Sequence, residues 1–174
     1  MNGNCHLFFG VSTATALALN LDKIAVSLPN VGSTPEWAAL LIFGVAAGSI
    51  FPDIDNENSH TAKLTAPVSS LICGINQLFG NNGKKHRGLL HDPFIYLLGL
   101  YLSYIFFPVC VPFFIGCITH VFLDIFNPAG VPFLFGVKHL SLKACPSASK
   151  GASILTAVWS VTALAVGIGL KFYL

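Results

Sequence analysis

Two ionisable residues stand inside one apolar stretch of this chain, at positions 116–130. His120 and Asp124 are four residues apart, so a helix places both side chains on one face, one turn from each other. Pro128 and Gly130 follow and would end such a helix. A buried histidine or aspartate needs a hydrogen-bonding partner or a metal ion. The spacing fits two ligands of one metal, with a structural hydrogen-bonded pair as the alternative.

Two further groups of polar residues stand at the edges of apolar segments. Asp53 and Asp55 flank one isoleucine directly after an apolar run, and two neighbouring carboxylates suit a hard or borderline cation. A solvated loop is the alternative there. His86, Arg87 and His91 lie just before the next apolar run. They fit a metal and phosphate site, or else a basic collar at a membrane boundary.

Composition sets the class of protein. Of 174 residues only 9% are charged and 54% are hydrophobic, with a mean hydropathy of +0.74, whereas soluble domains carry about 25% charged residues. Most of this surface therefore faces lipid.

The net charge of +2 is too small, and the basic residues too scattered, for a nucleic-acid partner. Five cysteines without CxxC spacing do not indicate a compartment. No linker divides the chain, so residues 1–174 are expected to form one domain.

Six apolar segments are separated by polar or breaker-rich stretches, and they predict an all-α, polytopic membrane helical bundle. The first resembles a signal peptide in length but lacks a basic leading region, so we expect a retained helix. One segment, 64–79, is interrupted by proline, glycine and polar residues and is expected to be an interfacial helix. About five helices are expected to span the membrane, at 7–21, 35–51, 94–107, 113–126 and 151–170.

The segment 94–126 decides where the ionisable residues lie. It is either a helical hairpin that turns at 108–112 or one long kinked helix. With five crossings, the hairpin places all six histidines and four of the five aspartates on one side of the membrane, with Asp22 as the exception. The single helix would separate His120 from His86 and His91. Because ionisable groups at a membrane are costly unless they act together, the hairpin is the favoured alternative.

Basic residues then predict the orientation. Seven of the nine lie on the side of the histidines, which should therefore be cytoplasmic. The exceptions are Lys23 and Lys171.

With these residues assembled, the chain resembles the YdjM-like family of bacterial membrane-bound metal-dependent hydrolases over most of its length. The motifs that carry the resemblance are His6 with Phe8 and Phe9, Pro52-Asp53-Ile54-Asp55 with Ser59, His86-Arg87-Gly88 with His91, and His120-x-x-x-Asp124 followed by residues 127–132. The chain departs from the family pattern at Asn56, Leu90 and Asp92, where the family usually has histidine, threonine and serine. The resemblance implies a multi-pass protein of the inner membrane. The ligand pattern is also similar to that of zinc-dependent phospholipases C and single-strand nucleases.

The expected site follows from the residues and the resemblance together. The expected metal ligands are His6, Asp53, Asp55, His86, His91, His120 and Asp124, with Asp55 and Arg87 also expected to act in catalysis. So many ligands exceed one tetrahedral site, so two or three Zn²⁺ ions are expected, with Mn²⁺ or Fe²⁺ as alternatives. His60 and His139 stay undecided.

The expected reaction is hydrolysis of a phosphoester of a membrane lipid at the cytoplasmic surface. Arg87 would bind a phosphate oxygen through its planar fork. The alternative is a non-enzymatic metal-binding membrane protein, either a transporter or an adaptor. The sequence identifies neither the lipid nor the oligomeric state.

Overall fold

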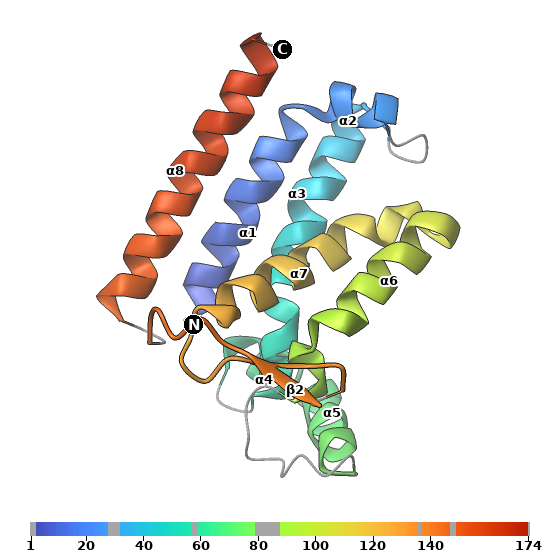
Figure 1. The fold of residues 1–174 in the computed structure, drawn as a ribbon. Helices are drawn as coiled ribbons and strands as arrows, with labels where there is room; N and C mark the ends of the chain where they lie inside the picture. Colours follow the sequence, from blue (N-terminus) through green and yellow to red (C-terminus); the bar gives the residue numbers. More distant parts are fainter. Residues whose placement is uncertain are drawn as a thin grey trace.

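The structure, a computed structural model, describes residues 3–27, 32–56, 59–78, 88–135, 137–146 and 149–173. These residues are mostly helical (Figure 1). In chain order the elements are α1 (Gly3–Ala18), α2 (Leu21–Ser27), α3 (Pro35–Ile50), the 3-10 helix η1 (Phe51–Asp55), α4 (His60–Leu64), α5 (Ala66–Leu78), the 3-10 helix η2 (Leu89–His91), α6 (Pro93–Phe106), the 3-10 helix η3 (Pro108–Cys110), α7 (Val111–Ile125), β1 (Val131–Phe133), β2 (Lys138–Leu140) and α8 (Lys150–Tyr173).

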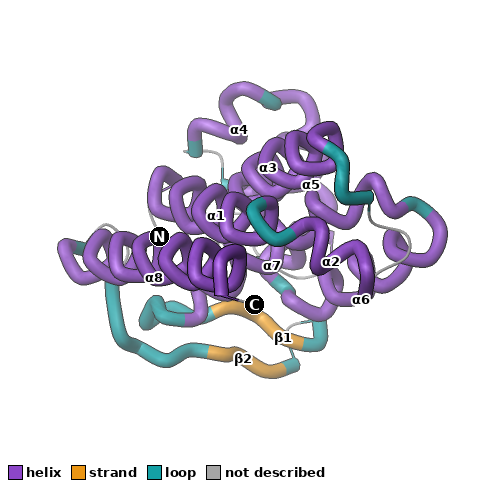
Figure 2. Tube along the Cα trace, turned by 90° about the horizontal axis from the view of Figure 1, so that it is seen from above, coloured by secondary structure: helices purple, strands orange, loops and turns teal. Residues whose placement is uncertain are grey.

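The crossing of α3 and α7 forms the centre of the bundle. Two glycines make this crossing close. A Cβ atom on Gly48 would lie 2.0 Å from the Phe113 carbonyl oxygen, and one on Gly116 would lie 2.3 Å from the Val45 carbonyl oxygen. Only glycine lets two helix backbones approach in this way. α1 packs against α3 on one side and α8 on the other, as Figures 1 and 2 show.

The structure confirms the hairpin rather than the single kinked helix. α6 ends at Phe106, and Pro108 opens η3, because proline cannot continue a helix through its own nitrogen. α7 begins at Val111 and returns beside α6. Gly99 of α6 meets the ring of Phe114 of α7, where a Cβ atom would lie only 2.3 Å from that ring. The turn therefore brings His120 back toward the end of the bundle from which α6 started.

The membrane-spanning prediction is confirmed in part. Among the described residues, three helices are long and apolar enough to cross a membrane, in the segments Pro35–Asp55, Pro108–Ile125 and Lys150–Tyr173. Two apolar helices are shorter, at Ala66–Ile75 and Pro93–Phe106. The 16 residues of α1 span about 24 Å, a little less than a hydrocarbon core of about 30 Å.

A small sheet corrects the all-α prediction. β1 and β2 pair antiparallel, with Val131 opposite Leu140 and Phe133 opposite Lys138. Gly130 has a φ of +65° and lies directly against the Leu140 carbonyl, so the chain turns sharply into β1. Pro132 cannot donate a ladder hydrogen bond, which keeps the pairing to two short strands. The Pro- and Gly-containing segment after α7 forms this hairpin.

The two ends of the bundle differ in chemistry (Figure 1). At one end lie α2 and the end of α8, where the Lys171 ammonium donates to the Asp22 carboxylate at 2.9 Å. At the other end lie the start of α1, η1, η2 and the sheet. Most of the predicted site residues lie at this second end. Which end faces the cytoplasm stays a prediction.

Candidate metal centre

Six of the predicted site residues meet in one buried cluster. The start of α1 contributes one histidine, η1 two aspartates, η2 one histidine, and α7 one histidine and one aspartate. None exposes more than 7% of its surface. The cluster consists of His6, Asp53, Asp55, His91, His120 and Asp124. Burying so many ionisable groups together requires hydrogen bonds or bound cations to offset the lost hydration.

His120 is oriented by the backbone of α3. Its Nδ1 atom lies 2.7 Å from the Ser49 carbonyl oxygen. A carbonyl only accepts, so Nδ1 must carry the hydrogen, and in the neutral ring the lone pair is at Nε2. This contact needs the close crossing at Gly48 and Gly116, since Ser49 directly follows the first of these glycines. The α3–α7 crossing therefore prepares Nε2 of His120 as a ligand atom.

His91 is oriented by Asp55. Its Nδ1 atom lies 3.3 Å from Asp55 Oδ2, and the same oxygen accepts a hydrogen bond of 3.0 Å from the Gly88 backbone N–H. Nδ1 pointing at a carboxylate leaves Nε2 of His91 as the other ligand atom. A carboxylate behind a metal-binding histidine is a common arrangement, because it fixes the tautomer and the ring direction.

The two prepared nitrogens face each other. Nε2 of His91 and Nε2 of His120 are 3.3 Å apart. Asp53 Oδ1 lies 3.9 Å from Nε2 of His91 and 3.7 Å from Nε2 of His120. Asp124 Oδ2 lies 3.6 Å and 3.9 Å from the same two atoms. Two facing lone pairs repel, so a cation or a shared proton between them is needed to stabilise the arrangement.

These distances suit a small divalent ion. Ligand atoms around a tetrahedral Zn²⁺, at bonds of about 2.0–2.2 Å, lie about 3.3–3.6 Å from one another. The five separations given above, 3.3–3.9 Å, are close to that range, and Asp53, His91 and His120 form one group that could hold an ion. Two imidazoles and two carboxylates are also ligands that zinc accepts. The residues therefore fit a zinc-sized ion.

His6 approaches the other side of Asp124. Its Nε2 atom lies 3.5 Å from Asp124 Oδ1, and its ring stacks on His120 with centroids 3.7 Å apart. Neither ring nitrogen of His6 makes a hydrogen bond to any part of the chain that the structure describes. A buried imidazole in this state is poised for a ligand, and Asp124 directs Oδ1 to His6 and Oδ2 to the His91–His120 pair.

Two overlapping groups could each hold a metal ion. One consists of His6, His120 and Asp124, and the other of Asp53, His91 and His120. Because Nδ1 of His120 faces the Ser49 carbonyl, only Nε2 remains to bind one ion. Within the described residues, Asp55 belongs to neither group. Its Oδ2 atom is directed at Nδ1 of His91, the ring nitrogen that points away from the proposed ion.

Polar contacts from α4 and α5 hold the backbone of η1 in place. The Ser59 hydroxyl donates to the Asp53 carbonyl at 2.7 Å, and the Ser69 hydroxyl donates to the Ile54 carbonyl at 2.7 Å. The Cys73 thiol lies 3.5 Å from the Asp55 carbonyl. Three consecutive carbonyls thus have partners from outside η1, which fixes the directions of both η1 carboxylates.

Other predicted or possible ligands lie elsewhere. His86 and Arg87 are outside the described residues, as is the placement of the His60 side chain. His139 is exposed on β2, opposite Pro132 and not in the cluster.

Sequence reasoning missed Asp92 and the Ser49 carbonyl. Asp92 is fully buried, caps α6 by accepting from the Phe94 N–H, and also accepts from the Phe135 N–H. It thereby ties the start of α6 to the turn of the sheet. The proline after Asp92 was a usable signal for a helix cap, whereas a backbone carbonyl leaves none in the sequence.

Comparison with known proteins identifies the family of this chain. A family model described as YdjM inner membrane protein matches residues 1–173. The comparison with curated proteins finds no match, and neither does the comparison with solved structures. With a match over nearly its whole length, this chain belongs to the YdjM family of inner membrane proteins.

Proposed function

We propose that this protein is a metal-dependent hydrolase that cleaves a phosphoester of a membrane lipid at the cytoplasmic surface. The observation that carries the proposal is the pair of Nε2 atoms of His91 and His120, 3.3 Å apart between two carboxylates. Each histidine directs its Nδ1 atom at a protein oxygen, Ser49 O or Asp55 Oδ2. The two Nε2 atoms point at the same space, where one metal ion would be bound by both.

The proposed assignment distributes the ligands over two ions that share Asp124. One ion would be held by Nε2 of His91, Nε2 of His120, Asp53 Oδ1 and Asp124 Oδ2. Oδ1 of Asp124 faces His6 at 3.5 Å, so Asp124 would bridge to a second ion bound by His6. Zn²⁺ fits this mixture of nitrogen and oxygen ligands best, with Mn²⁺ or Fe²⁺ as alternatives. When bound, such ions act as Lewis acids and lower the pKa of a coordinated water toward neutrality.

The remaining residues are proposed to orient a ligand, to bind the substrate phosphate or to bind the second ion. Asp55, first expected to be a ligand and a catalytic residue, is proposed to hold the tautomer and direction of His91 through Nδ1. Arg87 is proposed to bind a phosphate oxygen through two parallel N–H bonds, which a lysine cannot reproduce. His86, close to Arg87 in sequence, is kept as a further proposed ligand of the second ion.

A lipid substrate is favoured by the surface of α5. This helix turns its polar residues Ser69 and Cys73 inward to η1. Its outer stripe is apolar and exposed, with Val68 at 51% and Leu71 at 65%. An apolar outer face beside the cluster favours an interfacial helix in contact with lipid. The proposed site would then lie at the membrane boundary, within reach of lipid head groups.

A non-enzymatic metal site is the second candidate. It is favoured by the burial of the cluster. Of the four proposed ligands of the first ion, only the Asp53 side chain is exposed at all, to 10%. A structural site is closed, whereas a catalytic site keeps an open position. The two candidates share the ligands and differ only in turnover.

The experiment separates them. Protein purified without chelators is analysed for metal and then assayed on a panel of lipid phosphoesters. His120→Ala and Asp124→Asn should lose metal and hydrolysis together, while the matched control His139→Ala should lose neither. Metal without hydrolysis of any lipid would favour the non-enzymatic candidate. Less than one ion per chain after incubation with Zn²⁺ or Mn²⁺ would exclude both.

A further inference from the structure

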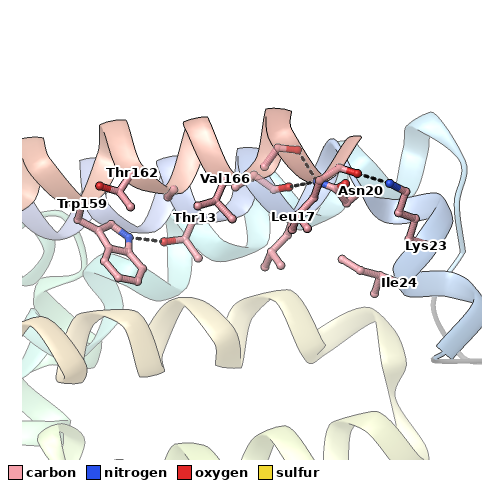
Figure 3. A pocket seen from close by; sticks show the side chains of 12 residues that line it. Thr13, Leu17, Asn20, Lys23, Ile24, Trp159, Thr162 and Val166 are labelled. Carbon is pink, nitrogen blue, oxygen red and sulfur yellow. Dashed lines mark hydrogen bonds between the residues drawn. The ribbon is translucent and has the colours of Figure 1, made fainter. Parts of the chain in front are cut away.

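A second feature of the molecule is a groove of about 650 Å³ along α1, α2 and α8. Its lining includes Leu17, Trp159 and Val166, whose side chains project into it from α1 and α8, as Figure 3 shows. The Trp159 indole N–H donates to the Thr13 hydroxyl at 2.9 Å, and the Asn20 amide donates to the Gly167 carbonyl at 2.8 Å. These donors are used within the walls, so the surface that remains is mostly apolar.

The groove has the depth of one membrane leaflet. Trp159 and Leu170 mark its two ends along α8, and eleven residues of helix measure about 16 Å. Half of a hydrocarbon core of about 30 Å is about 15 Å. Leu170 lies at the end of the bundle that holds α2, away from the metal centre. With its Leu170 end at the far membrane surface, the groove would reach about the middle of the bilayer.

One cation stands at the surface end of this groove. Among the described residues, Lys23 is the charged side chain in the lining, and its ammonium donates to the Leu170 carbonyl. An ammonium has three hydrogens, so two remain for a ligand. The neighbouring Lys171 is paired with Asp22 at 2.9 Å, and this hydrogen bond lowers the pKa of the Asp22 carboxyl. Asp22, adjacent to Lys23 in sequence, is therefore paired with Lys171, and the charge of Lys23 can attract an anion.

We propose that the groove binds one acyl chain of an anionic phospholipid from the leaflet opposite the metal centre, with the lipid phosphate at Lys23. An apolar wall one leaflet deep with a cation at its surface end matches the two parts of such a lipid. A helix of a second copy is the alternative occupant, and the experiment below distinguishes it. The inference is independent of the proposed hydrolysis.

Trp159 provides the measurement. The chain has two tryptophans, so Trp37→Phe leaves Trp159 as the single fluorophore. This protein is placed in phosphatidylcholine nanodiscs that contain a minor fraction of phosphatidylglycerol, and the acyl chains of one lipid or the other are brominated near their ends to quench tryptophan. A lipid that only surrounds the protein quenches Trp159 fluorescence in proportion to its fraction of the total lipid. Phosphatidylglycerol should exceed its share about fivefold, the factor for ~1 kcal/mol from one lysine.

Matched variants test the two ends of the groove. Val166→Phe fills the groove and should remove the excess quenching, while Val161→Phe on the same helix, outside the lining, should keep it. If Val166→Phe does not fold, Ala163→Leu fills the same space. Lys23→Gln should reduce the preference for phosphatidylglycerol to about one, while Lys63→Gln, on α4 at the end of the bundle that holds the metal centre, should leave it.

Three results would overturn the proposal. The first is quenching in proportion to lipid share in the protein without groove variants. The second is an excess that survives both Val166→Phe and Lys23→Gln. The third is protection of Trp159 from both brominated lipids, which a helix of a second copy in the groove would produce.

Discussion

Replacing Gly116 with alanine should weaken metal binding without removing any ligand. The added Cβ would lie 2.3 Å from the Val45 carbonyl oxygen, 2.8 Å from the Ser49 nitrogen and 2.9 Å from the Gly48 Cα. All three are backbone atoms, so no side-chain rotation relieves the contact. α3 and α7 must separate, and the His120 imidazole moves with α7.

The size of the effect follows from these distances. An ordinary contact begins near 3.4 Å, so the helices must separate by about 3.4 − 2.3 = 1.1 Å. If that shift falls on the hydrogen bond from His120 Nδ1 to the Ser49 carbonyl, its length rises from 2.7 Å to about 3.8 Å, beyond the usual limit of about 3.2 Å. Loss of a partner behind a metal ligand weakens metal binding about 10- to 100-fold. Overpacking should also cost about 1–3 kcal/mol of unfolding free energy.

The assay is competition for Zn²⁺ between the purified protein and a fluorescent chelator. Gly169→Ala is the matched control, because it also adds one methyl group to a long apolar helix but meets nothing within 4 Å. It should bind metal like the unaltered protein. If a folded Gly116→Ala, judged by its circular dichroism, also binds Zn²⁺ with unaltered affinity, the proposed link from helix crossing to His120 to metal is wrong.

Three other predictions concern the site and its orientation. Asp55→Asn should keep the metal stoichiometry but lower Zn²⁺ affinity about 10- to 100-fold in the same competition assay, because the carboxylate orients His91 rather than binding the ion; complete loss of metal would instead make it a ligand. Arg87→Lys should keep the metal and lower hydrolysis about 100-fold or more, since lysine lacks the planar fork; unaltered turnover would mean that only its charge matters. Single cysteines at positions 59 and 149, in a background without the five native cysteines, should both be labelled from the cytoplasmic side, and labelling from opposite sides would contradict the shared site.

The helices were largely predictable because their signals are local. Long apolar runs set the five main helices, and the proline-rich break at 108–112 indicated a hairpin. Local signals did not reveal the small sheet, whose strands of three residues depend on pairing across the turn and on the contact of Phe135 with Asp92. A strand that short has no periodicity of its own to detect.

Residue types and spacing also indicated the candidate site. The four-residue interval from His120 to Asp124 and the two carboxylates of η1 pointed to ligands before any fold was known. The topology of the hairpin then required the histidines of η2 and α7 to share one side of the membrane. These inferences depend only on the order of polar and apolar residues along the chain.

The sequence could not assign atoms to roles, and the tertiary structure did. Asp53 and Asp55 are separated in sequence by one isoleucine. Asp53 Oδ1 nevertheless faces the Nε2 atoms of His91 and His120, while Asp55 Oδ2 faces Nδ1 of His91. Likewise, the carbonyl that fixes His120 belongs to Ser49, 71 residues earlier. The physical reason is that a ligand's direction depends on contacts between elements that pack together only in the folded chain, here through the glycines at the crossing of α3 and α7.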